Sequence, residues 1–64
     1  MKSYDKNDFI KTQNGEVWCI EEIHNQYVYI FNVHTKEKDY MTTRTLDWLI
    51  LNGHIDIYCA DYEW

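Results

Sequence analysis

The chain has 64 residues and a formal net charge of −5, and it contains three Trp, six Tyr and two Phe but no Pro. A chain of this length forms one domain and buries only about 60% of the surface that it exposes when unfolded. The excess of carboxylates disfavours direct binding to nucleic-acid phosphates, and the size leaves little room for a deep substrate pocket. We therefore expect a single small domain over residues 1–64 that is stabilised by aromatic packing.

The two ends of the chain are predicted to lie outside the core. Residues 1–7 are polar and are expected to form a flexible N-terminus, and residues 60–64 are expected to form a C-terminal tail. The first residues contain no apolar segment of the kind found in a signal peptide, and no apolar run approaches the ~18 residues of a membrane span. The cytoplasm is the expected location.

Taken in chain order, short runs of β-branched and aromatic residues alternate with turn residues. Asn14 and Gly15 favour a type I′ hairpin, in which both residues have positive φ. The run 27–33 is apolar on both faces, which predicts a central strand or a strand whose outer face is covered by the helix or by a partner. The predicted strands are residues 9–12, 16–23, 27–33, 39–42 and 54–59.

Between residues 43 and 52 the hydrophobic pattern changes to a helical period. Leu46, Leu49 and Ile50 fall on one face, Thr42 or Thr43 can cap the N-terminus, and Gly53 suits the left-handed position after the C-terminus. Combined with the alternating strands, this pattern predicts which residues form the core. They are Val28, Ile30, Leu46, Ile50, Ile55 and Ile57.

The layout of these elements resembles that of SH3-like small barrels. The residues that carry the resemblance are the run 8–12, the run 14–18 and the hairpin into residues 27–33, followed by a helix that directly precedes a last strand. The resemblance covers residues 8–59 and implies an α+β fold, a small SH3-like antiparallel barrel of about five strands with one helix before the last strand. It implies no particular activity, because one fold supports many functions.

Candidate catalytic and metal-binding residues are few. Cys19 and Cys59 lie in predicted strands and are interpreted as buried, reduced thiols; a disulfide would require neighbouring strands and an oxidising compartment. His24, His34 and His54 lie near turns or strand ends, without the spacing of metal ligands. A Cys19–His24 dyad would lack a third group to orient it. We therefore expect no enzymatic activity, no catalytic residue, no metal and no cofactor.

Candidate partner-binding residues lie in two places. Trp48 and Leu51 project from the helix on the side opposite its core face, together with Asp47, although Trp48 can alternatively cap the open end of the barrel. The C-terminal segment joins aromatic and acidic side chains, namely Asp61, Tyr62, Glu63 and Trp64. Aromatic and acidic groups together suit a basic protein surface.

These observations predict a non-enzymatic protein-interaction module that docks an acidic and aromatic surface on a basic site of a larger protein. The abundance of residues with AT-rich codons suggests a phage or mobile-element inhibitor acting in the cytoplasm of a bacterial host, with anti-CRISPR proteins or nucleic-acid mimics as one version. A homo-oligomer that assembles through the helix face is the alternative. A small enzyme or metal protein is the third class and has the least support.

Overall fold

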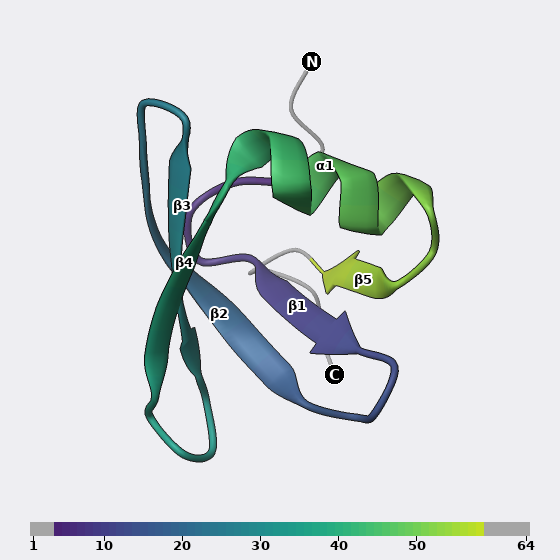
Figure 1. Cartoon of the computed structure of the whole chain (residues 1–64). Helices are drawn as coiled ribbons and strands as arrows, with labels where there is room; N and C mark the ends of the chain where they lie inside the picture. The colour runs from purple at the N-terminus through teal and green to yellow at the C-terminus, as the bar shows by residue number, and fades with distance from the viewer. Residues whose placement is uncertain (1–3, 59–64) are drawn as a thin grey trace.

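The computed structural model describes residues 4–58, which form an antiparallel sheet with one helix beside it (Figure 1). The elements are β1 (Phe9–Thr12), β2 (Val17–His24), β3 (Tyr27–Asn32), β4 (Lys38–Thr42), α1 (Thr43–Leu51) and β5 (Ile55–Tyr58). The strand order is β4-β3-β2-β1-β5, so the last strand returns beside the first, and β4 and β5 are the two edges. The expected α+β fold is confirmed, whereas the sheet is not closed between β4 and β5.

The first hairpin differs from the expected type I′ turn. Gly15 has a φ of 89°, but Asn14 is not among the residues with positive φ. The Thr12 N–H donates to the Glu16 carbonyl at 2.9 Å, which leaves a three-residue loop, Gln13 to Gly15. Such a loop combines an ordinary turn with one left-handed glycine. The Asn-Gly pair therefore marks the turn correctly but gives the wrong turn type.

The helix begins and ends where the sequence indicates. Thr42 is the N-cap, and its hydroxyl accepts the N–H of Thr45 at 3.2 Å. At the other end Gly53 has a φ of 73°, its N–H donates to the Ile50 carbonyl, and the His54 N–H donates to the Leu49 carbonyl at 2.9 Å. This pair of bonds is a Schellman motif, which satisfies carbonyls that the end of a helix leaves open.

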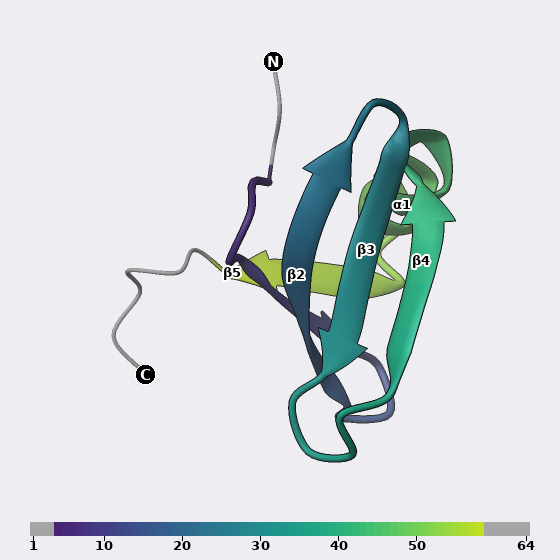
Figure 2. The same ribbon diagram turned by 90° about the vertical axis from the view of Figure 1, so that its left-hand side faces the viewer.

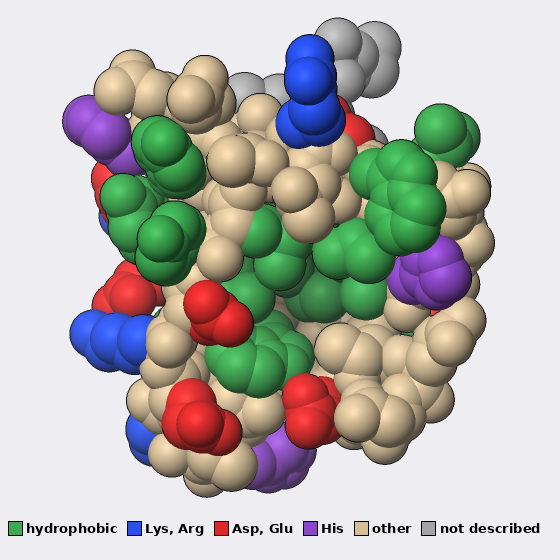
Figure 3. All heavy atoms as spheres, in the orientation of Figure 1, with side chains coloured by type: hydrophobic (Ala, Val, Ile, Leu, Met, Phe, Trp, Pro, Cys, Tyr) green, Lys and Arg blue, Asp and Glu red, His purple; other side chains and the backbone are tan. Residues whose placement is uncertain are grey.

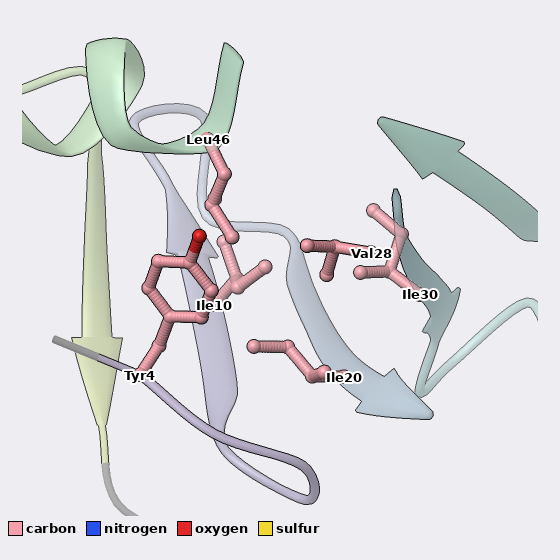
Figure 4. Packing of buried hydrophobic residues seen from close by; sticks show 6 residues of the cluster. All are labelled: Tyr4, Ile10, Ile20, Val28, Ile30 and Leu46. Carbon is pink, nitrogen blue, oxygen red and sulfur yellow. The ribbon is translucent and has the colours of Figure 1, made fainter. Parts of the chain in front are cut away.

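The core lies between α1 and the concave face of the sheet. Leu46 points from α1 toward Ile10 of β1, and side chains of β2 and β3 complete the cluster (Figure 4). The expected burial of Val28, Ile30 and Leu46 is confirmed. Ile50, Ile55 and Ile57 are only half-buried and pack against the margin of the cluster, because they border the side on which the sheet stays open.

The N-terminal segment is packed from Tyr4 onward. The Tyr4 ring lies in the core beside Leu46 (Figure 4). The Asn7 N–H donates to the Ile20 carbonyl at 2.8 Å, and Asn7 takes a left-handed φ of 75° to do so. Asp8, which is buried, accepts the backbone N–H of Asp5. The flexible segment expected over residues 1–7 therefore does not fit residues 4–7, because a tyrosine ring fills space that the short chain cannot otherwise fill.

One extra residue interrupts the pairing of β2 with β3. Ile20 pairs with Ile30, but Glu22 pairs with Tyr29, so Glu21 is a β-bulge. The bulge places Glu21 and Glu22 together on the exposed side while Ile20 and Ile23 both remain on the core side. Within residues 4–58, the nine-residue helix α1 falls short of the length and apolarity needed to cross a bilayer.

Candidate functional site: the exposed aromatic surfaces

The predicted helix residues Trp48 and Leu51 are exposed, and together they are called the helix patch. Trp48 is 55% and Leu51 86% accessible. The Trp48 ring does not cap the sheet; it stacks on the imidazole of His54 with ring centroids 5.2 Å apart and an interplanar angle of 21°. The helix patch is therefore a surface feature held in place by the Schellman turn that carries His54.

Asp47, the third predicted helix residue, has an intramolecular role. Its carboxylate lies near the Tyr4 hydroxyl, so that α1 and the N-terminal segment influence each other. Burial, followed by the nearby negative charge of Asp47, raises the pKa of Tyr4 to about 12. The remaining predicted partner residues, Asp61, Tyr62, Glu63 and Trp64, lie outside the described residues.

The burial of Tyr4 beside Asp47 predicts a loss of stability in alkali. Because the pKa of Tyr4 rises from 10.0 to about 12 on folding, its contribution is fully present below pH 10 and is lost as the pH rises toward 12. We expect the urea midpoint of the wild type to fall across this window and that of Tyr4→Phe to fall less. Tyr40→Phe, at an exposed tyrosine, is the matched control. Equal alkaline losses in all three proteins would contradict the assignment.

Three tyrosines form an exposed cluster on the convex side of the sheet, and this cluster is called the tyrosine face. Tyr27 and Tyr29 lie on β3 and Tyr40 on β4, with accessibilities of 38%, 39% and 61%. The Tyr40 ring is 6.2 Å from that of Tyr27 and 6.0 Å from that of Tyr29. Figure 3 shows hydrophobic side chains gathered over β3 and β4 at the left edge of the molecule.

The carboxylates beside the tyrosine face are paired with lysines. Glu21 lies 3.5 Å from the Lys38 ammonium group, and Glu22, which is opposite Tyr29, lies 3.3 Å from that of Lys6. Both pairs are exposed and contribute little to stability. Their effect on the surface is larger, because they leave the tyrosine face apolar and close to neutral.

A second aromatic surface lies on the concave side, at the end of the sheet remote from α1. Trp18 on β2 shares this side with buried Ile20, and it pairs with Ile10 and Asn32. Trp18 is only half-buried because α1 starts at the opposite end of the strands, where the Thr43 N–H donates to the Gln26 carbonyl. Figure 3 shows hydrophobic side chains between β4 and α1, with acidic side chains below them.

Three carboxylates lie on the same side of the sheet as Trp18. Glu16 accepts the indole N–H of Trp18 at 3.1 Å. Asp39 on β4 pairs with Ile30. The Asn32 N–H donates to the Glu37 carbonyl, so Glu37 lies across from Asn32, the residue with which Trp18 pairs. The ion pairs of the described residues are Lys6–Glu22 and Lys38–Glu21, so none of these three is neutralised. Trp18, Glu16, Glu37 and Asp39 are together called the Trp18 face.

The cysteine and histidine predictions have mixed outcomes. Cys19 is a buried thiol, as expected, and burial, followed by the charges of Asp8 and Glu21, raises its pKa. Cys59 lies outside the described residues. Among residues 4–58 the His, Cys, Asp and Glu side chains form no group that could hold a metal ion. A depression of about 460 Å³ beside the start of α1 is lined by four polar residues, Gln26, Thr42, Thr43 and Arg44.

The tyrosine face and the Trp18 face were not among the predicted site residues, although the sequence carries a signal for the first. The run 27–33 is apolar on both sides and was expected to be covered by the helix or a partner. In the structure α1 packs on the other side of the sheet, so Tyr27 and Tyr29 remain uncovered. The Trp18 face carries no such signal, because its members come from two separate parts of the chain.

Comparison with protein-family models, with curated proteins and with solved structures finds no match for this chain.

Proposed function

We propose that the chain is a non-enzymatic protein-interaction module that docks an acidic and aromatic surface on a basic site of a larger protein. The observation that carries this proposal is the Trp18 face. Its half-exposed indole donates to Glu16 and shares one side of the sheet with Glu37 and Asp39, and none of these three carboxylates forms an ion pair within residues 4–58. Tryptophan is enriched where binding energy concentrates, and unpaired carboxylates favour a cationic partner.

The proposal includes an SH3-like architecture. Four consecutive antiparallel strands, the return of β5 to β1 and the helix between β4 and β5 support it. Because β4 and β5 do not pair and α1 covers only one end of the concave side, the other end stays open. A partner can therefore reach Trp18, although the domain is too small to hold a deep cleft.

The proposal also extends to the biological setting inferred from the sequence. A phage or mobile-element inhibitor in a bacterial cytoplasm is consistent with a net charge of −5 and with the abundance of amino acids whose codons are AT-rich. In the mimicry version, Glu16, Glu37 and Asp39 occupy positions that phosphates occupy in the partner's usual ligand. In both versions the attraction weakens with added salt, because exposed charges are screened over about 8–10 Å.

Titration with a labelled oligolysine peptide tests the Trp18 face. The double variant Glu16→Gln/Asp39→Asn removes two charges but keeps the oxygens that accept the Trp18 and Tyr40 N–H groups. We expect its Kd to rise about two- to thirtyfold, at roughly 0.2–1 kcal/mol per exposed charge pair. The control Glu22→Gln/Asp56→Asn makes the same change in net charge elsewhere. Equal losses in both double variants would show attraction without a defined site and would contradict the proposal.

A second candidate function is a homo-oligomer that assembles through the helix patch. The exposure of Trp48 and Leu51 favours it, because large apolar side chains clustered on a monomer commonly mark an interface. In that case Trp48→Ala lowers the molar mass measured by sedimentation equilibrium and leaves the binding of oligolysine unchanged.

A further inference from the structure

We propose that the tyrosine face and the free edge of β4 form an interface with a second copy of this chain. In this interface the two β4 strands pair antiparallel about a twofold axis at Tyr40, so that the two sheets become continuous. The inference does not rest on the proposed function, whose Trp18 face lies on the other side of the sheet and shares only Asp39 with the β4 edge.

The backbone of β4 is suited to this pairing. β4 is the last strand in the sheet order and the outermost ribbon on its side in Figure 2. The Asn32 N–H donates to the Glu37 carbonyl and the Thr43 N–H to the Gln26 carbonyl. With the register of β3 and β4, these two bonds determine which β4 residues direct their backbone N–H and C=O groups toward β3 and which direct them away. Asp39 and Met41 therefore direct their backbone groups toward β3, whereas Lys38, Tyr40 and Thr42 direct their N–H groups away from it. An added strand finds these groups at the open edge.

A twofold axis at Tyr40 gives a register in which the side chains that face each other are compatible. The Tyr40 N–H and carbonyl meet those of Tyr40 in the second copy, and Lys38 lies opposite Thr42. The row of Tyr29 and Tyr40 then continues into the same row of the second copy, which gives the adjacent aromatic pairs that stabilise sheets. Asp39 lies opposite Met41, so no two like charges are directly opposed in this register.

Charge selects a second copy as the occupant of this surface. The chain carries a net charge of −5, so self-association requires a face on which the charges are already balanced. The tyrosine face meets this requirement, because Lys6 and Lys38 neutralise Glu22 and Glu21. The Trp18 face does not, since a twofold contact there would bring unpaired carboxylates together. A neutral aromatic face beside an open strand edge is the kind of self-complementary patch that a twofold interface needs.

Asp39 opposes the pairing and thereby sets its strength. The Asp39 carboxylate accepts the Tyr40 N–H at 2.7 Å, and this N–H is the one that the second copy must engage. Inward charges of this kind protect edge strands against uncontrolled pairing. The carboxylate must leave the Tyr40 N–H on association, so we expect a reversible dimer that forms at high protein concentration.

Sedimentation equilibrium over a range of protein concentrations tests the interface. We expect a monomer–dimer equilibrium for the wild type. Tyr40→Lys should raise the dissociation constant at least about tenfold, because it replaces an aromatic pair at the axis with two opposed ammonium groups. Trp48→Lys makes the same kind of change on the helix patch, at a side chain of similar exposure, and should leave the dissociation constant unchanged.

Two variants at Asp39 keep the test decisive if Tyr40→Lys fails to fold. Asp39→Asn removes the charge but keeps a side-chain carbonyl oxygen for the Tyr40 N–H, whereas Asp39→Thr removes both the charge and that carbonyl oxygen and leaves only a hydroxyl one bond closer to the backbone. Dimerisation should strengthen in the order wild type, Asp39→Asn, Asp39→Thr. Hydrogen exchange at the Tyr40 amide should slow with protein concentration. A wild type and an Asp39→Thr variant that both remain monomeric at millimolar concentration would overturn the proposal, as would a dimer that Trp48→Lys dissociates and Tyr40→Lys does not.

Discussion

Leu46→Ala is expected to unfold the domain or to leave it barely folded. Leu46 is fully buried, and it is the one α1 side chain in the cluster with Tyr4, Ile10 and the β2 and β3 residues. Truncating a buried leucine to alanine costs about 2–5 kcal/mol, since the lost apolar contact is combined with a cavity. A domain of this size has roughly 3–10 kcal/mol in total, at about 0.05–0.15 kcal/mol per residue. Urea denaturation followed by circular dichroism measures the effect.

The matched control for this prediction is Leu51→Ala. Leu51 lies on the same helix but is 86% accessible, so its truncation removes no core contact. Surface substitutions of this kind change stability by about 0.5 kcal/mol or less. If both variants had the same urea midpoint as the wild type, α1 would not be part of the folded core and the packing described here would be wrong.

Asn32→Ala is expected to be the most damaging substitution of a polar side chain. Asn32 is 4% accessible, and its Oδ1 accepts the backbone N–H groups of His34 at 2.8 Å and of Thr35 at 3.0 Å. These bonds hold the loop that returns the chain from β3 to β4, where Lys36 takes a left-handed φ of 67°. Leaving partly buried donors without an acceptor costs about 1–3 kcal/mol. The urea midpoint should fall accordingly.

The control for Asn32 is Asn52→Ala. The Asn52 amide also bonds to the backbone, at the Trp48 carbonyl, but in an exposed position where water can replace it. Its loss should cost about 0.5 kcal/mol or less. If Asn52→Ala lowered the stability as much as Asn32→Ala, the burial of the Asn32 acceptor would not be the cause of the loss.

The sequence predicts the elements and their order because their signals are local. The alternation in residues 27–33, the threonine before the helix and the glycine after it each depend on neighbours a few residues away. The observed helix, Thr43–Leu51, ends one residue before the predicted bound. β1 has the predicted bounds, and each of the other four strands differs from prediction by one residue at one end or at both. The core residues of β3 and the centre of α1 follow from the same patterns.

The candidate surfaces are less predictable because they depend on which side of the sheet the helix covers. Tyr27 and Tyr29 would have been core residues had α1 packed on the convex side. Trp18 and Asp39 are 21 positions apart in the sequence and share a face only through the register of β2, β3 and β4. Tyr4 lies in a segment whose composition is polar, and its burial depends on a space beside Leu46 that no local pattern reveals.

The bulge at Glu21 makes β2 tolerant of a change in length. The core-side residues of this strand are spaced by two positions from Trp18 to Ile20 and by three from Ile20 to Ile23. Removing one glutamate would restore the regular alternation and leave all three apolar side chains on their present side. A one-residue deletion, which reverses the sides of every later residue in an ordinary strand, would here remove only one ion pair with a lysine. Chains of this fold can therefore differ by one residue at this place and keep the same core.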